Sequence, residues 1–141
     1  MGKMEVSVLI DAPVSKVYRF VSNIETHPRF ADICKSLKIT SRKRRGVGVT
    51  FAQVVQHRGR LSDLCSRIVE CKPNKIVKWV NLDPDGSTTQ VIYHFVKADG
   101  GTKVVHQLIG KHLNSDEALR LATAENRVEL AKLKMILERR R

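Results

Sequence analysis

The sequence predicts an α+β fold with seven strands, two short helices after the first strand and one long helix at the C-terminal end. Three observations support this prediction. An alternating apolar segment leads directly into a helix that begins at a proline, turn signals divide residues 34–111 into six strand-like segments, and the apolar period becomes helical after residue 115. A chain of 141 residues is long enough to bury a core of its own, so we expect residues 1–141 to form a single domain.

The first strand and the helix after it are the most sharply defined part of the pattern. Apolar residues alternate over residues 6–10, as in a strand with one buried face. We expect Asp11 to cap the following helix and Pro13 to occupy its first turn, where the missing N–H costs nothing. One face of this helix is apolar, formed by Val14, Val17, Tyr18 and Val21. A second short helix is expected over residues 24–31.

Six further strands are expected between turns rich in glycine, proline, asparagine and aspartate. Their ranges are 34–41, 47–56, 61–71, 75–81, 88–96 and 102–111. In the fifth strand of the chain we expect Lys78 to face water, which sends Val77 and Trp79 inward. We expect Asp63, Cys65 and Arg67, which share one face of the fourth strand, to lie on a solvated outer face.

The register of the last hairpin decides which side chains share the inner face. A two-residue turn at residues 99–100 pairs Tyr93 with His106 and, on the same face, Phe95 with Val104 and Val91 with Leu108. A three-residue turn would shift the register by one and place His94 opposite His106. We favour the first register because it gathers the larger apolar residues on one face.

The last segment reads as one long amphipathic helix. Ser115 can cap it, and it is expected to run to about Arg139, a length of roughly 36 Å. Its expected inward face has apolar residues at spacings of three and four, namely Leu121, Ala124, Val128, Ala131 and Met135.

The order of elements and the first thirty residues together resemble the Bet v 1-like, START-related (SRPBCC) superfamily, in particular its polyketide cyclase/dehydrase and coenzyme Q-binding branch. The residues that carry the resemblance are Val6, Val8, Ile10, Ala12, Pro13, Val17, Tyr18, Val21, Asn23, Ile24, Pro28 and Phe30. The resemblance implies a helix-grip fold, in which a strongly curved antiparallel sheet grips the C-terminal helix and leaves a hollow between them.

The same resemblance places ligands in that hollow. The expected wall consists of Trp79, Tyr93, Phe95, His106 and Leu108 from the strands, with Leu121 and Val128 from the helix. Tyr93 could offer a polar contact to a ligand carbonyl or hydroxyl. The alternative is that these residues fill a solid core, since a sequence does not distinguish a wall from a packed interior.

Several classes of chemistry have no support in the sequence. The five histidines and three cysteines show no compact metal-ligand spacing, and there is no nucleophile elbow, phosphate-binding loop or dinucleotide fingerprint, so we assign no catalytic residue, no metal and no cofactor. The three cysteines are expected to be free thiols. Without a membrane-span pattern or a signal-peptide pattern, a soluble cytoplasmic protein is expected.

The charge distribution is the second unusual feature of the chain. It has 26 Lys and Arg against 14 Asp and Glu, and no acidic residue occurs between Ile33 and Ser62. A candidate docking set for phosphate or anionic lipid lies in this window, comprising Arg42, Lys43, Arg44, Arg45, Arg58 and Arg60. The simpler alternative is a solvated basic surface. Aromatic residues make up only 5% of the chain and none interrupts the run 42–45, so base stacking on RNA has little support.

Three functions remain open from the sequence. The first is binding or transport of a small hydrophobic molecule, such as a lipid, a polyprenyl quinone or a polyketide-like compound, by a carrier that could dock on an anionic membrane. The second is an enzyme of the polyketide cyclase or dehydratase type, in which Tyr93 or His106 would move a proton. The third is an RNA- or ribosome-associated regulator that uses the basic surface. The sequence gives no prediction of oligomeric state.

Overall fold

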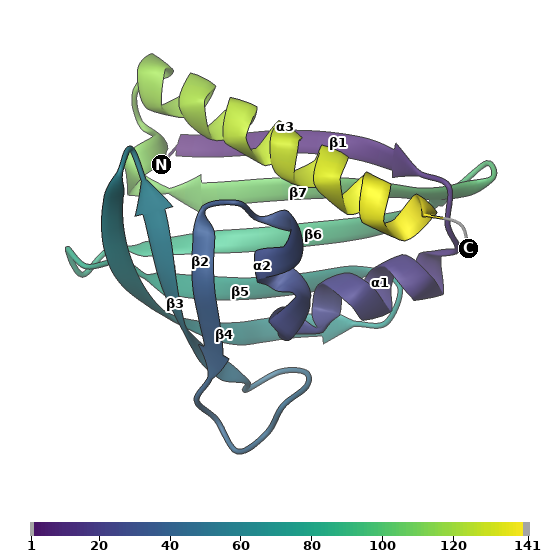
Figure 1. Cartoon of the computed structure of the whole chain (residues 1–141), viewed down its shortest axis with the longest axis horizontal. Helices are drawn as coiled ribbons and strands as arrows, with labels where there is room; N and C mark the ends of the chain where they lie inside the picture. The colour runs from purple at the N-terminus through teal and green to yellow at the C-terminus, as the bar shows by residue number, and fades with distance from the viewer. Residues whose placement is uncertain (1, 140–141) are drawn as a thin grey trace.

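A seven-stranded antiparallel sheet curls around one long helix (Figure 1). The computed structural model describes residues 2–139. The strands are β1 (Gly2–Ile10), β2 (Cys34–Ile39), β3 (Thr50–His57), β4 (Arg60–Lys72), β5 (Ile76–Leu82), β6 (Thr88–Ala98) and β7 (Gly101–Gly110). The helices are α1 (Val14–Ser22), α2 (His27–Phe30) and α3 (Asp116–Glu138), with two 3-10 turns, η1 (Ile24–Thr26) and η2 (Lys111–Leu113). The predicted α+β fold is therefore confirmed.

The strands lie in the order β1-β7-β6-β5-β4-β3-β2. Every strand after β1 pairs with its neighbour along the chain, and β1 closes the order by pairing with β7. The helices α1, α2 and α3 cover the concave face of this sheet (Figure 1). No helix within residues 2–139 is both long and apolar enough to cross a membrane.

The start of α1 differs from the prediction. Pro13, in an extended conformation, is the residue that precedes the helix, and no side chain caps it. The prediction that Asp11 caps this helix is wrong, because the chain first makes a tight turn in which Ala12 N–H donates to the Ile10 carbonyl. The backbone N–H of Asp11 instead donates to Glu138 Oε2 at 2.7 Å, which ties this turn to the end of α3.

The predicted register of the last hairpin is confirmed. A two-residue turn, with Gly100 at a φ of +76°, pairs Tyr93 with His106. Trp79 on β5 faces the same side and is 1% exposed. This register brings the large rings of three neighbouring strands onto the concave face.

The C-terminal helix begins as predicted but presents another face to the sheet. Ser115 Oγ accepts the N–H of Ala118 at 3.1 Å, which confirms the cap. The predicted inward face is wrong: Val128 is 55% exposed and Met135 63%, while Leu121 is only half-buried. The buried residues are Ala122, Asn126, Glu129, Leu130, Leu133 and Leu137. This stripe was missed because two of its members are polar, and their partners on the sheet are described below.

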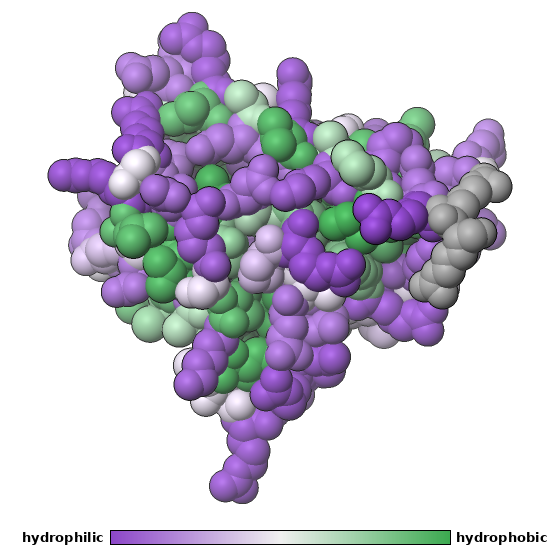
Figure 2. All heavy atoms as spheres, in the orientation of Figure 1, coloured by the Kyte–Doolittle hydropathy of each residue, from purple (hydrophilic) through white to green (hydrophobic). Residues whose placement is uncertain are grey.

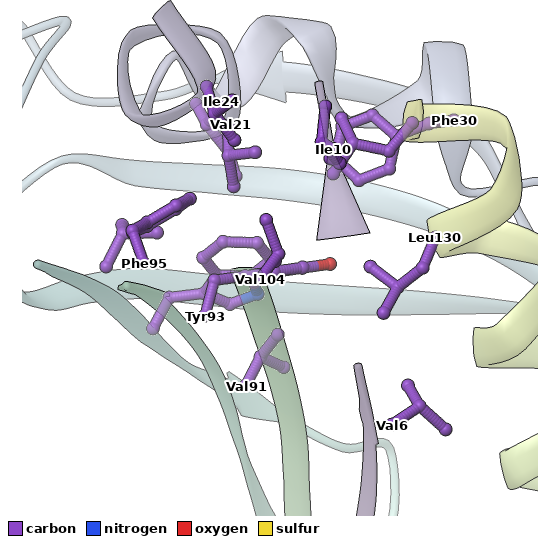
Figure 3. Packing of buried hydrophobic residues seen from close by; sticks show 14 of the residues in the cluster. Val6, Ile10, Val21, Ile24, Phe30, Val91, Tyr93, Phe95, Val104 and Leu130 are labelled. Carbon is purple, nitrogen blue, oxygen red and sulfur yellow. The ribbon is translucent and has the colours of Figure 1, made fainter. Parts of the chain in front are cut away.

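The outer face of β4 agrees with the prediction. Asp63, Cys65 and Arg67 are all exposed. All three cysteines are free thiols, with Cys34 buried and Cys71 half-buried. The main hydrophobic cluster lies on the concave side, where Figure 3 shows Tyr93 among apolar side chains from the helices and the strands.

Candidate functional site

A stack of aromatic rings occupies the centre of the concave face. The His106 ring lies flat on the Tyr93 ring, with centroids 4.1 Å apart and an interplanar angle of 6°. Trp79 lies next to Tyr93 at 5.5 Å, and His27 of α2 meets Trp79 edge-on at 5.2 Å. His27, Trp79, Tyr93 and His106 are all buried. Three strands and α2 thus bring two imidazoles, an indole and a phenol into direct contact.

Helix α3 supplies polar partners to this stack. The Tyr93 hydroxyl donates a hydrogen bond to the Glu129 carboxylate. His106 Nε2 lies 2.9 Å from Asn126 Oδ1 and 3.5 Å from Glu129 Oε2. On the other side of the ring, His106 Nδ1 lies 3.1 Å from the Ile92 carbonyl oxygen. Tyr93, His106, Asn126 and Glu129 therefore form one buried hydrogen-bonded group, which we call the interior polar cluster.

The partners of His106 are oxygen atoms on both sides of the ring. A backbone carbonyl only accepts, so His106 Nδ1 donates to Ile92. Asn126 Nδ2 donates to the Ala122 carbonyl at 2.7 Å, which turns the amide oxygen toward the imidazole. Both ring nitrogens of His106 therefore face oxygen atoms that can accept a hydrogen bond, and the Glu129 carboxyl group lies near the same edge of the ring as Asn126.

Burial controls the electrostatics of this interior. It raises the pKa of Glu129, while His106 and Tyr93 act in the opposite direction. It also raises the pKa of Tyr93 well above the ordinary value, assisted by the charge on Glu129. Burial and then His106 lower the pKa of His27 from 6.5 to about 3, so this imidazole is neutral. Burial followed by Glu129 raises the pKa of Cys34 to about 11, so its thiol keeps its proton.

Some buried polar side-chain atoms have no hydrogen-bond partner in the protein. Among the described residues, these atoms are Trp79 Nε1, His27 Nδ1 and Asn23 Oδ1. An indole N–H can only donate, so the surroundings of Trp79 lack a hydrogen-bond acceptor. Leaving a buried donor unpaired costs free energy, and a guest molecule with an oxygen atom could remove that cost.

The structure brings together some of the predicted wall residues and separates others. Trp79, Tyr93 and His106 are in contact, and Phe95 packs edge-on against Tyr18 of α1. Leu108 is partly buried against the same core. Leu121 and Val128 lie outside the buried stripe of α3, which meets the sheet through Asn126, Glu129 and the apolar residues near them.

Buried side chains from the sheet and the helices surround Tyr93 (Figure 3). Two surface depressions lie elsewhere. One, of about 480 Å³, covers the outer side of β3, β4 and β5, where Cys65, Val80 and Leu82 line it. The other, of about 580 Å³, lies beside the first half of α3, along Leu119, Thr123 and Arg127. Access to the interior polar cluster therefore requires a helix or side chains to move.

The predicted basic docking set falls into two groups at opposite ends of β3. Arg42, Lys43, Arg44 and Arg45 are exposed on the loop between β2 and β3, at the bottom of Figure 1. Arg58 and Arg60 belong to the β3–β4 hairpin, where Arg58 Nη2 lies 3.3 Å from Glu117 Oε1 of α3. The segment 33–62, which contains no acidic residue, thus contributes its basic docking residues to two separate surfaces.

The sequence prediction missed His27, Asn126 and Glu129. One physical argument could have found the two α3 residues. Tyr93 and His106 were expected to face the interior, and a buried hydroxyl or imidazole needs hydrogen-bond partners. Helix α3 has a stripe at spacings of three and four that combines apolar residues with Asn126 and Glu129, and this stripe can supply both partners. For His27 we find no comparable signal.

A comparison with known proteins identifies the family of the chain. Residues 10–121 match the family described as polyketide cyclase / dehydrase and lipid transport. The chain belongs to this family. No curated protein matches the chain significantly in sequence.

Several solved structures have a similar fold. A START superfamily protein from Mycobacterium smegmatis superposes with a TM-score of 0.83 at 14% identity, over 98% of both chains. The di-domain ARO/CYC protein StfQ from the steffimycin biosynthetic pathway gives 0.77 at 15% identity, over 96% of this chain and 50% of its own. Ara h 8.0201 gives 0.72 at 15% identity, over 96% of both. These likenesses confirm the predicted helix-grip fold.

Proposed function

We propose that the protein binds a small hydrophobic molecule between the sheet and α3, and that the bound molecule carries an oxygen atom that accepts a hydrogen bond. The observation that carries the proposal is the interior polar cluster next to a buried Trp79 N–H that has no acceptor. A core that served only stability would gain more from apolar side chains at these positions.

Apolar burial would supply most of the binding free energy. Each square ångström of apolar surface removed from water contributes about 25 cal/mol before ordering costs are subtracted. The site then orients the ligand, because only a molecule with a suitably placed oxygen satisfies the unpaired Trp79 N–H next to the interior polar cluster. A lipid, a polyprenyl quinone and a polyketide-like compound all combine a large apolar surface with such an oxygen.

Identification of a retained compound tests this proposal. We expect native mass spectrometry of the purified protein to show a stoichiometric adduct that organic extraction removes. Added ligand should then change the fluorescence of Trp79, the only tryptophan of the chain. Tyr93→Phe should weaken binding, whereas Tyr18→Phe, on the half-buried face of α1, is the matched control. A protein that is reproducibly empty and that no lipid or quinone stabilises against heat would contradict the proposal.

An enzymatic role of the polyketide cyclase or dehydratase type is the second candidate, and one observation favours it. Tyr93, Glu129 and His106 place a phenol, a carboxyl group and an imidazole within one hydrogen-bonded group. Such a group can hold and move a proton next to a substrate carbonyl. Conversion of a poly-ketone substrate that Tyr93→Phe abolishes without unfolding the protein would support catalysis; unchanged conversion would exclude this assignment.

We further propose that the protein acts in the cytoplasm and exchanges its ligand at an anionic membrane surface. The exposed basic residues of the β2–β3 loop support this part of the proposal. A regulator that binds RNA through the same residues is the alternative. Aromatic stacking, which usually contributes to single-strand binding, would need exposed rings. Among the described residues every aromatic side chain is buried or half-buried, so we favour the membrane.

A further inference from the structure

The loop between β2 and β3 carries a concentrated positive charge. Residues 42–45 are four consecutive exposed basic residues, and the loop extends away from the sheet in Figure 1. Figure 2, in the same orientation, shows hydrophilic side chains reaching outward at this end. Val47, two residues after the basic run, is 49% exposed. The loop therefore presents positive charge together with an apolar side chain.

The base of this loop is firmly attached to the sheet. Gly48 N–H donates to the Ile68 carbonyl at 2.9 Å, and Val49 is completely buried. Thr50 N–H donates to Ser41 Oγ at 3.1 Å, which closes the two ends of the loop on each other. The direction in which the basic run projects is thus fixed relative to the strands.

Two of the four basic residues hold a carboxylate on the neighbouring segment. Arg44 Nη2 lies 2.8 Å from Glu25 Oε2, and Arg45 Nη1 lies 3.8 Å from Glu25 Oε1. Glu25 belongs to η1, and its side chain is about half exposed. The link therefore joins the projecting loop to the segment 24–30.

That segment is the cover of the candidate site on the side of α2. Two residues after Glu25, His27 meets Trp79 at 5.2 Å, and Phe30 meets Tyr93 at 6.4 Å. Phe30 is completely buried and lies opposite Tyr93 in Figure 3. Displacing η1 and α2 would uncover the aromatic rings next to the interior polar cluster.

We propose that the β2–β3 loop docks on an anionic phospholipid bilayer and that docking opens the segment 24–30 by taking Arg44 and Arg45 away from Glu25. This inference rests on the proposed function, because it assigns to the ligand site the surface that controls access. Lipid phosphates replace the carboxylate as partners of the two guanidinium groups, and Val47 enters the interface region. Glu25 is then left facing a surface of its own charge.

The size of the effect follows from the exposure of the ion pairs. Arg44 and Arg45 are 58% and 59% exposed, so their link to Glu25 is screened by water and salt. Loss of such a pair shifts an opening equilibrium by no more than about fivefold. Docking therefore biases the cover toward opening without unfolding it.

Vesicles with and without phosphatidylserine test both parts of this inference. Co-flotation reports docking, and acrylamide quenching of Trp79 fluorescence reports opening, because Trp79 is 1% exposed and contacts His27. We expect the protein to float with phosphatidylserine vesicles only, and quenching to rise when it does. Arg42→Gln with Lys43→Gln should reduce flotation and leave quenching without vesicles unchanged. Lys97→Gln with Lys103→Gln, the matched control on the exposed β6–β7 hairpin, should leave flotation at the wild-type level.

Glu25→Gln separates opening from docking. Without vesicles, this variant should already be quenched more strongly than wild type, by up to about fivefold. Flotation with unchanged quenching, or Glu25→Gln that behaves as wild type, would overturn the coupling. Binding of RNA but not of vesicles would overturn the choice of partner. If docking and opening occur but the purified protein never retains an apolar compound, the proposed ligand-binding function fails while this surface assignment stands.

Discussion

Removing the carboxylate of Glu129 tests whether the interior contains a charged pair. Glu129→Met removes the acceptor of the Tyr93 hydroxyl and the carboxyl group beside His106, and the Tyr93 and His106 side chains are only 0% and 1% exposed. Breaking a buried pair in this way costs about 3–5 kcal/mol of unfolding free energy. Adding His106→Leu should recover most of that loss, because apolar side chains replace a complete buried ion pair at little cost.

Urea unfolding of wild type, both single variants and the double variant measures this coupling. We expect the loss in the double variant to be smaller than the sum of the two single losses by about 2 kcal/mol or more. Far-ultraviolet circular dichroism is the suitable probe, since Trp79 fluorescence also responds to the local packing. Single losses that add to within about 0.5 kcal/mol would refute the hypothesis that His106 and Glu129 form a charged pair.

Further predictions concern His27 and α3. The pKa of His27 is about 3 in the folded state against 6.5 in the unfolded state, so between these pH values the folded state binds fewer protons. The stability that His27 contributes above pH 6.5 is therefore lost as the pH falls, by at most about 1.4 kcal/mol per pH unit. His27→Leu should remove that part of the slope in acid titrations of stability; an unchanged slope would contradict the neutral assignment. Leu133→Ala, at a fully buried position, should cost about 2–5 kcal/mol, whereas Val128→Ala should stay within about 0.5 kcal/mol; the reverse order in urea unfolding would restore the predicted face of α3. Ser115→Ala should lower stability by about 1 kcal/mol through loss of the cap, and no change would argue against that hydrogen bond.

Local signals predicted the sheet well. The two-residue turn before Gly101 determines which residues of β6 and β7 face each other, and period-two patterns determine which side chains point inward. Both are properties of neighbouring residues, so the sequence suffices to pair Tyr93 with His106. The start of α1 was harder to predict. The N–H of Asp11 has its partner on Glu138, at the far end of the chain, and no local pattern reports such a contact.

Only the sheet residues of the interior polar cluster, Tyr93 and His106, could be predicted from the sequence. Apolar residues follow two different stripes of α3, and counting them favours the stripe with Val128 and Met135. In the structure the other stripe faces the sheet, because Tyr93 and His106 require hydrogen-bond partners and the buried side chains of Glu129 and Asn126 supply them. The orientation of α3 therefore depends on how its polar side chains match those of the sheet. The apolar period of the helix alone does not contain this information.

The pairing of β1 with β7 has a consequence for folding during synthesis. Gly2 pairs with Gly110, so β1 leaves the ribosome about 100 residues before β7, the strand that pairs with it. At ordinary elongation rates of about 5–20 residues per second, that wait lasts roughly 5–20 seconds. Val6 and Ile10, which end up buried, are exposed on an unpaired strand throughout this time. Association with a chaperone or another nascent chain is thus a risk set by the strand order itself.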